Sequence, residues 1–111
     1  MPFFNPQPQI ATPTTGQTVI IKRFDGKAQD ILIAPSTALA AASIVFPMAY
    51  PGQTITTFWT QAITLVTMTA ANSPTGGAVT VQNPLGLFLG VGAKTWTYWE
   101  FGTTRQWLVK V

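Results

Sequence analysis

The stretch from Pro51 to Thr69, PGQTITTFWTQAITLVTMT, decides the fold class of this chain. It opens on a Pro-Gly turn, continues through two apolar segments interleaved with threonine, and carries no charge. Short runs of β-branched and aromatic residues bounded by turn residues are typical of strands. We therefore predict strands over 53–59 and 63–70. In the second strand Leu65 and Val66 are adjacent, which predicts that both faces of that strand are partly covered.

Turn residues separate further β-rich runs on both sides of this stretch. The segment from Thr18 to Ala34 is predicted to be a hairpin, because Asp25-Gly26 is a strong two-residue turn signal. The other predicted strands are SIVF (43–46), AVTVQ (78–82), LGLFLGV (85–91), KTWTYWEF (94–101) and RQWLVKV (105–111). The last two are expected to form a closing pair joined by Gly102-Thr103-Thr104. About eight or nine short strands without a convincing helix predict an all-β fold. We expect a single domain over 18–111, an antiparallel β-sandwich or barrel of the jelly-roll type.

The first 17 residues, MPFFNPQPQIATPTTGQ, are predicted to form an extended N-terminal arm. Their four prolines favour polyproline-like backbone and exclude helix and central strand. A disordered terminus is one interpretation, since most domains have one. The other is an arm that docks onto another protein, because Phe3, Phe4 and Ile10 are apolar groups that a solvating tail does not normally carry.

Charge is scarce and confined to two short segments. Charged residues are 8% of the chain, against about 25% in an ordinary soluble domain. Every charged side chain lies between Lys22 and Asp30 or between Lys94 and Lys110, and the 63 residues from Ile31 to Ala93 carry none. This neutral surface is either solvated by hydroxyls and amides or covered by identical or other subunits. Low charge is typical of the buried centre of an interface, which favours subunit cover.

Membrane and nucleic-acid partners are not expected. A transmembrane helix needs about 20 consecutive apolar residues, whereas the best candidate, Ala38 to Tyr50, has 13 and is interrupted by Pro47. The net charge of +3 comes from only nine charged residues. That number is too small for a basic patch that follows phosphates.

The sequence offers little for catalysis. It contains no histidine and no cysteine, and its acidic residues are Asp25, Asp30 and Glu100. Nucleophilic triads and thiolate or imidazole zinc sites cannot be built from these residues within one chain. Asp25 lies in a predicted turn, which explains it without a chemical role. We expect no enzymatic activity, no cofactor and no metal.

The aromatic residues allow two interpretations. They form either a flat platform on which sugars stack or the core and the subunit interface, where aromatic side chains bury large areas. The long neutral block needs cover, which favours the second. The residues assigned to core or interface are Phe58, Trp59, Trp96, Trp99 and Trp107.

The order of segments resembles a recurring module of tailed-bacteriophage virion proteins. In that module an apolar segment ending in proline precedes a Gly-Gln turn and a threonine-rich strand, then an Ile-Thr strand, and near the end a tryptophan with alternating apolar and basic residues. The matching segments here are IAPSTALAAASIVFP (33–47), PGQTITTFW (51–59), QAITLVTMT (61–69) and RQWLVKV (105–111). Such modules occur in head-decoration (cement) proteins, head fibres and tail fibres, commonly as β-structured homotrimers.

The resemblance implies a structural role in a virion. We expect a capsid decoration protein on the outer surface of the head, a homotrimer whose partner is the major capsid protein. The arm would dock on the capsid through Phe3, Phe4 and Ile10. The alternative is a carbohydrate- or receptor-binding tip of a fibre or spike, which Trp96 and Trp99 in the penultimate strand keep open.

Overall fold

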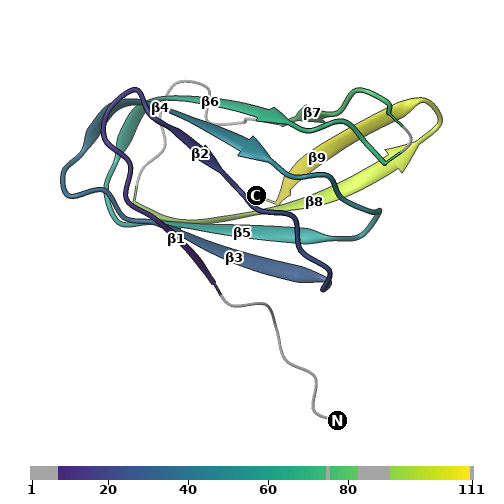
Figure 1. Ribbon diagram of the computed structural model, residues 1–111, viewed down its shortest axis with the longest axis horizontal. Coiled ribbons are helices and arrows are strands. Elements are labelled where there is room, and N and C mark those ends of the chain that lie inside the picture. Colours follow the sequence, from purple (N-terminus) through teal and green to yellow (C-terminus); the bar gives the residue numbers. More distant parts are fainter. Residues whose placement is uncertain (1–7, 75, 83–90, 111) are drawn as a thin grey trace, which may run out of the picture.

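The structure of the chain is a computed structural model that describes residues 8–74, 76–82 and 91–110. Within these ranges the regular structure consists of nine β-strands without a helix, which confirms the all-β prediction (Figure 1). The part so described holds no helix long and apolar enough to cross a membrane. The strands are β1 (Gln9–Ala11), β2 (Thr18–Ile20), β3 (Ala28–Ile33), β4 (Leu39–Phe46), β5 (Thr54–Trp59), β6 (Ile63–Ala70), β7 (Thr80–Val81), β8 (Gly92–Phe101) and β9 (Thr104–Lys110).

The chain alternates between two sheets. One sheet has six strands in the order β1-β3-β5-β8-β9-β7, and the other has three in the order β2-β4-β6. From β1 to β6, each coil of the chain therefore adds one strand to each sheet, and Figure 1 shows the two sheets as opposite layers. Three successive coils stacked in this way give the arrangement of a β-solenoid, in which each repeat contacts its neighbours.

The predicted antiparallel pairing is wrong for most of the molecule. Five of the seven strand pairs are parallel, and only β5–β8 and β8–β9 are antiparallel. The segment from Thr18 to Ala34 is not a hairpin, because β2 and β3 belong to different sheets. A type I′ hairpin turn would need positive φ at Asp25 and Gly26, and neither residue has it. The connection instead crosses between the sheets and buries Ile21 and Phe24 on the way.

Three other predictions have different outcomes. The closing hairpin is confirmed, since β8 and β9 pair antiparallel around Gly102, whose φ is +59°. Most of the predicted strand LGLFLGV lies outside the described residues. Of the predicted arm, Gln9–Ala11 forms β1 and pairs with β3, so this part of the segment lies within the six-stranded sheet.

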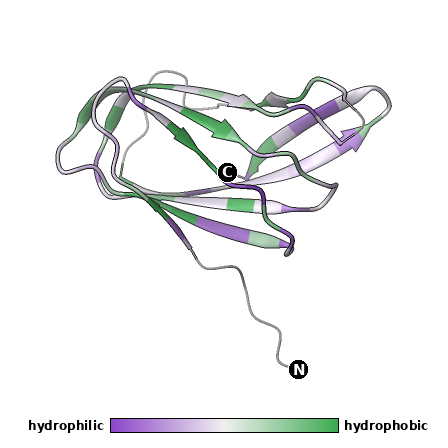
Figure 2. Cartoon of the chain, in the orientation of Figure 1, coloured by the Kyte–Doolittle hydropathy of each residue, from purple (hydrophilic) through white to green (hydrophobic). Residues whose placement is uncertain are grey.

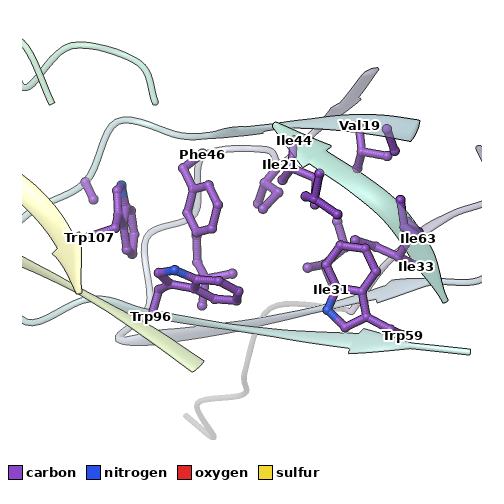
Figure 3. Packing of buried hydrophobic residues seen from close by; sticks show 14 of the residues in the cluster. Val19, Ile21, Ile31, Ile33, Ile44, Phe46, Trp59, Ile63, Trp96 and Trp107 are labelled. Carbon is purple, nitrogen blue, oxygen red and sulfur yellow. The ribbon is translucent and has the colours of Figure 1, made fainter. Parts of the chain in front are cut away.

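The core lies between the two sheets and is closed at one end by aromatic side chains. Inward residues alternate with outward ones along the strands, as in β3 and β5. Where the β8–β9 hairpin covers the last coil, Trp96 and Trp107 contact Phe46 at ring-centroid distances of 5.4 and 5.2 Å (Figure 3). Tyr98 lies 5.4 Å from Trp107 in the same cluster. Edge-on and tilted contacts of this kind are favourable for aromatic pairs.

The break in alternation at Leu65 and Val66 has a counterpart in the neighbouring strand. On β6, Ile63 and Val66 are buried with two exposed residues between them, and on β4 Leu39 and Ala42 are spaced in the same way. The two strands are in register here, so both change face at the same level of the sheet. Leu65 consequently points outward and is 42% exposed, so this part of the outer face is only partly covered within the described chain.

Candidate interaction surfaces

In the part of the chain that the structure describes, no group of three or more His, Cys, Asp or Glu residues could hold a metal ion. The candidate surfaces are the outer faces of the two sheets, the exposed end of the β8–β9 hairpin and the groove at the first coil.

The outer face of the three-stranded sheet carries no charged residue among those described. Its rows are set by the strand register: one row consists of hydroxyl side chains, and the next of β-branched ones. Figure 2 shows β2, β4 and β6 coloured from near white to green. We call this surface the neutral face; its residues are Thr18, Ile20, Ala41, Ser43, Val45, Leu65, Thr67 and Thr69.

The outer face of the six-stranded sheet combines an apolar row with a charged one. Ile10, Leu32, Phe58 and Ala93 are register partners across β1, β3, β5 and β8, and we call them the apolar row. Ile10 is 67% exposed and Phe58 40%. Two of the four residues thus present large apolar groups to the surroundings.

The neighbouring row runs in register from a carboxylate to an ammonium group. It consists of Asp30, Thr56, Thr95 and Lys110, and the hydroxyls of Thr56 and Thr95 are hydrogen-bonded at 2.9 Å. Unlike the neutral face, this face therefore carries charges of both signs.

The aromatic residues singled out in the sequence divide between core and surface. Trp59, Trp96 and Trp107 are at most 3% exposed and lie in the core, so they offer no platform for a ligand. Trp99 is 47% exposed, and Phe58 lies in the apolar row. Phe3 and Phe4, the predicted docking residues of the arm, lie outside the described residues.

The outward aromatic residues of the hairpin extend past the neighbouring strand. The register of β5 with β8 ends at the Thr54–Thr97 pair, and the hairpin continues beyond it. Trp99 lies beside Gln106 and the 55% exposed Phe101 beside Thr104. This end of the hairpin, which β7 borders at the Thr80–Gln106 pair, offers two aromatic side chains with one amide and one hydroxyl.

On the opposite side of the hairpin, Tyr98 and Glu100 are hydrogen-bonded. The Tyr98 hydroxyl donates to Glu100 Oε2 at 2.8 Å. Burial, this hydrogen bond and the carboxylate charge raise the pKa of Tyr98 to about 12, against a smaller opposing effect of Arg105. A tyrosine that retains its proton in this way is a structural hydrogen-bond donor, not a base.

The open end of the solenoid is partly closed by a glutamine side chain. Gln9 Nε2 donates to the Ile20 carbonyl at 2.8 Å, and the Lys22 N–H donates to Gln9 Oε1 at 3.0 Å. The groove between β1 and β2 has a volume of about 220 Å³. Short edge strands whose backbone groups are already bonded resist pairing with another chain.

Gln53 is a residue that sequence reasoning did not single out, although it belongs to the Gly-Gln turn of the resemblance. It is 7% exposed, and its Nε2 donates to the carbonyls of Phe24 and Gly26 at 3.2 and 2.8 Å. Its Oε1 accepts from the Tyr50 N–H at 3.0 Å. Gln53 thus joins the turn before β5 to the connection before β3.

Comparisons with known proteins give no further lead. A scan against protein-family models finds no match, and searches of curated proteins and of solved structures find none either. The functional assignment therefore depends on the surfaces described above and on the order of segments in the sequence.

Proposed function

We propose that this chain is a structural protein of a bacteriophage virion, a capsid decoration protein that binds the outer surface of the head as a homotrimer. The protein would stabilise the capsid by binding alone, because any molecule that binds the assembled shell more tightly than its separate subunits stabilises the shell by mass action. The observation that carries the proposal is the presence of two outer β-faces with exposed large apolar side chains, Ile10, Ile20, Phe58 and Leu65 among them. Exposed apolar surface on a sheet is typical of a protein interaction site.

The six-stranded face is the better candidate for contact with the major capsid protein. Its apolar row lies beside a row with charges of both signs, and a mixed surface of this kind suits a partner of different, complementary composition. Ile10 belongs to the apolar row and follows closely on the segment with Phe3 and Phe4. The predicted arm and the apolar row would then form one continuous capsid-binding surface.

The experiment is a binding measurement on purified heads that lack the protein. We expect the full chain to co-sediment with heads to a saturable stoichiometry, and heads that carry it to resist heat or low ionic strength better. Deletion of residues 1–7, which leaves β1 intact, should weaken binding without unfolding the chain. Phe58→Ser should weaken it as well, and Thr64→Ser on the other sheet is the control. Absence of saturable binding by the full chain would contradict the proposal.

A carbohydrate-binding tip is the second candidate, and the hairpin end favours it. Trp99 and Phe101 are exposed there, and Gln106 supplies an amide beside Trp99. Binding on a glycan array that is lost in Trp99→Ala and Phe101→Ala, with unchanged circular dichroism, would support this function. Trp96 is unsuitable for the test, because it is 1% exposed and its removal would disturb the core.

A further inference from the structure

We infer that the neutral face is the surface through which copies of this chain contact one another, around the threefold axis of the proposed homotrimer. The inference rests on the proposed self-association and assigns the contact between copies to the three-stranded sheet. The occupant of the face is thus a second copy of this chain, not the capsid.

The first reason is the exposure of large apolar side chains on the outer face of the three-stranded sheet. Large apolar groups on an exposed sheet face are typical of an interaction surface. The inner face lies on the core, but Ile20 and Leu65 on the outer face are 64% and 42% exposed with respect to the described chain. A second layer is therefore expected on that side.

The second reason is the distribution of charge. Copies arranged around a threefold axis bring equivalent residues together close to that axis, so a charged patch there would face like charge. The chain has a net charge of +3. None of its nine charged residues, all of which lie in the described ranges, belongs to the neutral face. The six-stranded face, by contrast, carries Asp30 and Lys110 in one row.

The third reason is the chemistry of the hydroxyl row. Thr18, Ser43 and Thr67 are register partners, so their side chains form one line across the three strands. A hydroxyl both donates and accepts hydrogen bonds, and a row of hydroxyls can therefore satisfy an identical row. Rows of ammonium or carboxylate groups cannot do this, since each offers only donors or only acceptors. The polar part of the neutral face is thus compatible with its own copy.

Contact through the face is more consistent with the structure than addition of a strand at the β2 edge. The side chain of Gln9 already bonds the Ile20 carbonyl and the Lys22 N–H on that edge. Backbone groups that are bonded within the chain are not free to extend the sheet into another molecule. The outer side chains of β2, β4 and β6 are therefore a more suitable contact surface than the β2 edge.

Two matched variants of the full chain test the inference. Leu65 on the neutral face and Phe58 on the six-stranded face are 42% and 40% exposed, each within a strand, and lysine adds one positive charge at either position. We expect L65K to weaken self-association about 100-fold or more in sedimentation equilibrium, because it places like charges at a symmetric contact. F58K should retain the oligomeric state of the wild type. Circular dichroism and thermal melting show that both variants fold.

Each outcome has a definite meaning. Dissociation by F58K but not by L65K, by both variants or by neither would overturn the inference, and so would a wild-type chain that stays monomeric at about 100 μM. If L65K shifts the melting transition, Thr67→Lys replaces it as the neutral-face variant with the same expected dissociation. Binding to heads is scored separately: F58K should remain oligomeric and bind heads poorly. A wild-type oligomer that L65K dissociates but that never binds heads would contradict the proposed function and leave the inference standing.

Discussion

The indole of Trp107 packs against the ring of Phe46 at a centroid distance of 5.2 Å and thereby joins the two sheets. Phe46 is the last residue of β4 in the three-stranded sheet, whereas Trp107 lies on β9 in the six-stranded sheet. Both side chains are fully buried. The contact lies where the hairpin closes the last coil, so it should contribute strongly to stability.

Replacement of Trp107 by alanine should lower the free energy of unfolding by about 3–5 kcal/mol, the usual cost of a large cavity in a core. Trp107→Phe should cost much less, because the buried indole N–H has no hydrogen-bond partner among the described residues that could be lost. Trp99→Ala, on the exposed side of the hairpin, is the control and should change stability by about 1 kcal/mol or less. Urea unfolding of the three variants checks this, and equal losses for Trp107→Ala and Trp99→Ala would contradict it.

Alkaline pH should destabilise the chain through Tyr98. Its pKa is raised to about 12 in the folded state, against about 10 in an unfolded chain. Between these values the folded state holds a proton that the unfolded state has lost. This contribution to stability is complete below pH 10 and falls as pH rises towards 12, by at most about 1.4 kcal/mol per pH unit.

Unfolding measured from pH 8 to pH 12 separates this effect from others. Tyr98→Phe should lose about 1 kcal/mol near neutral pH, because its hydrogen bond to Glu100 is absent, and should show a shallower decline above pH 10. Glu100→Gln removes the carboxylate that helps to raise the pKa of Tyr98 and should show an intermediate decline. A slope in Tyr98→Phe equal to that of the wild type would refute the assignment.

Gln53→Ala should destabilise the fold by about 2–3 kcal/mol, because removal of a buried hydrogen-bonding side chain leaves its partners unsatisfied. Three backbone groups depend on this amide, those of Phe24, Gly26 and Tyr50. Gln106→Ala, at a partly exposed position on β9, should change the free energy of unfolding by about 0.5 kcal/mol or less. A similarly small change in the free energy of unfolding of Gln53→Ala, measured in denaturant titrations, would show that the link between the turn before β5 and the connection before β3 does not depend on this side chain.

Substitution of Gly77 should be coupled to Arg105. A Cβ atom at position 77 would overlap the Arg105 guanidinium group. We expect Gly77→Ala to cost about 1 kcal/mol or less, since the flexible arginine side chain can move aside. In an Arg105→Ala background the same substitution should cost less, and a double-mutant cycle measures the difference. Additive effects of the two substitutions would mean that the overlap is relieved in another way.

The positions of the strands could be predicted from the sequence, but their partners could not. The threonine-rich runs at 53–59 and 63–70 match β5 and β6 closely. Asp25-Gly26 signals a change of direction, yet a local turn signal does not specify which sheet receives the next strand. Ile21 and Phe24, both buried, carry this connection across the core.

The stacked coils could not be predicted from the sequence, because equivalent positions in successive coils differ in residue type. Register partners in neighbouring coils include Ile31 with Thr57 and Ile33 with Trp59, which share only their inward direction. The buried Thr57 is accommodated because its hydroxyl accepts a hydrogen bond from Trp59 Nε1 at 2.6 Å. Partners stand 22 positions apart for Gln9 and Ile31 but 26 for Ile31 and Thr57, so no constant period exists.

One part of the candidate surfaces, the exposed Trp99, could have been predicted from the sequence. Alternation along β8 places Trp96 and Tyr98 on the inner side and Trp99 on the outer side, and this parity could have separated the exposed tryptophan from the buried ones. The apolar row could not have been found, because Ile10, Leu32 and Phe58 come together only through the parallel register of β1, β3 and β5.

The most direct test of the central claim is electron cryomicroscopy of the phage particle proposed to carry this chain. Its density is expected on the outside of the head, as a threefold cluster with the six-stranded face toward the shell and the neutral faces around the axis. Density for the chain only on the tail or a fibre, or its absence from the particle, would contradict the account.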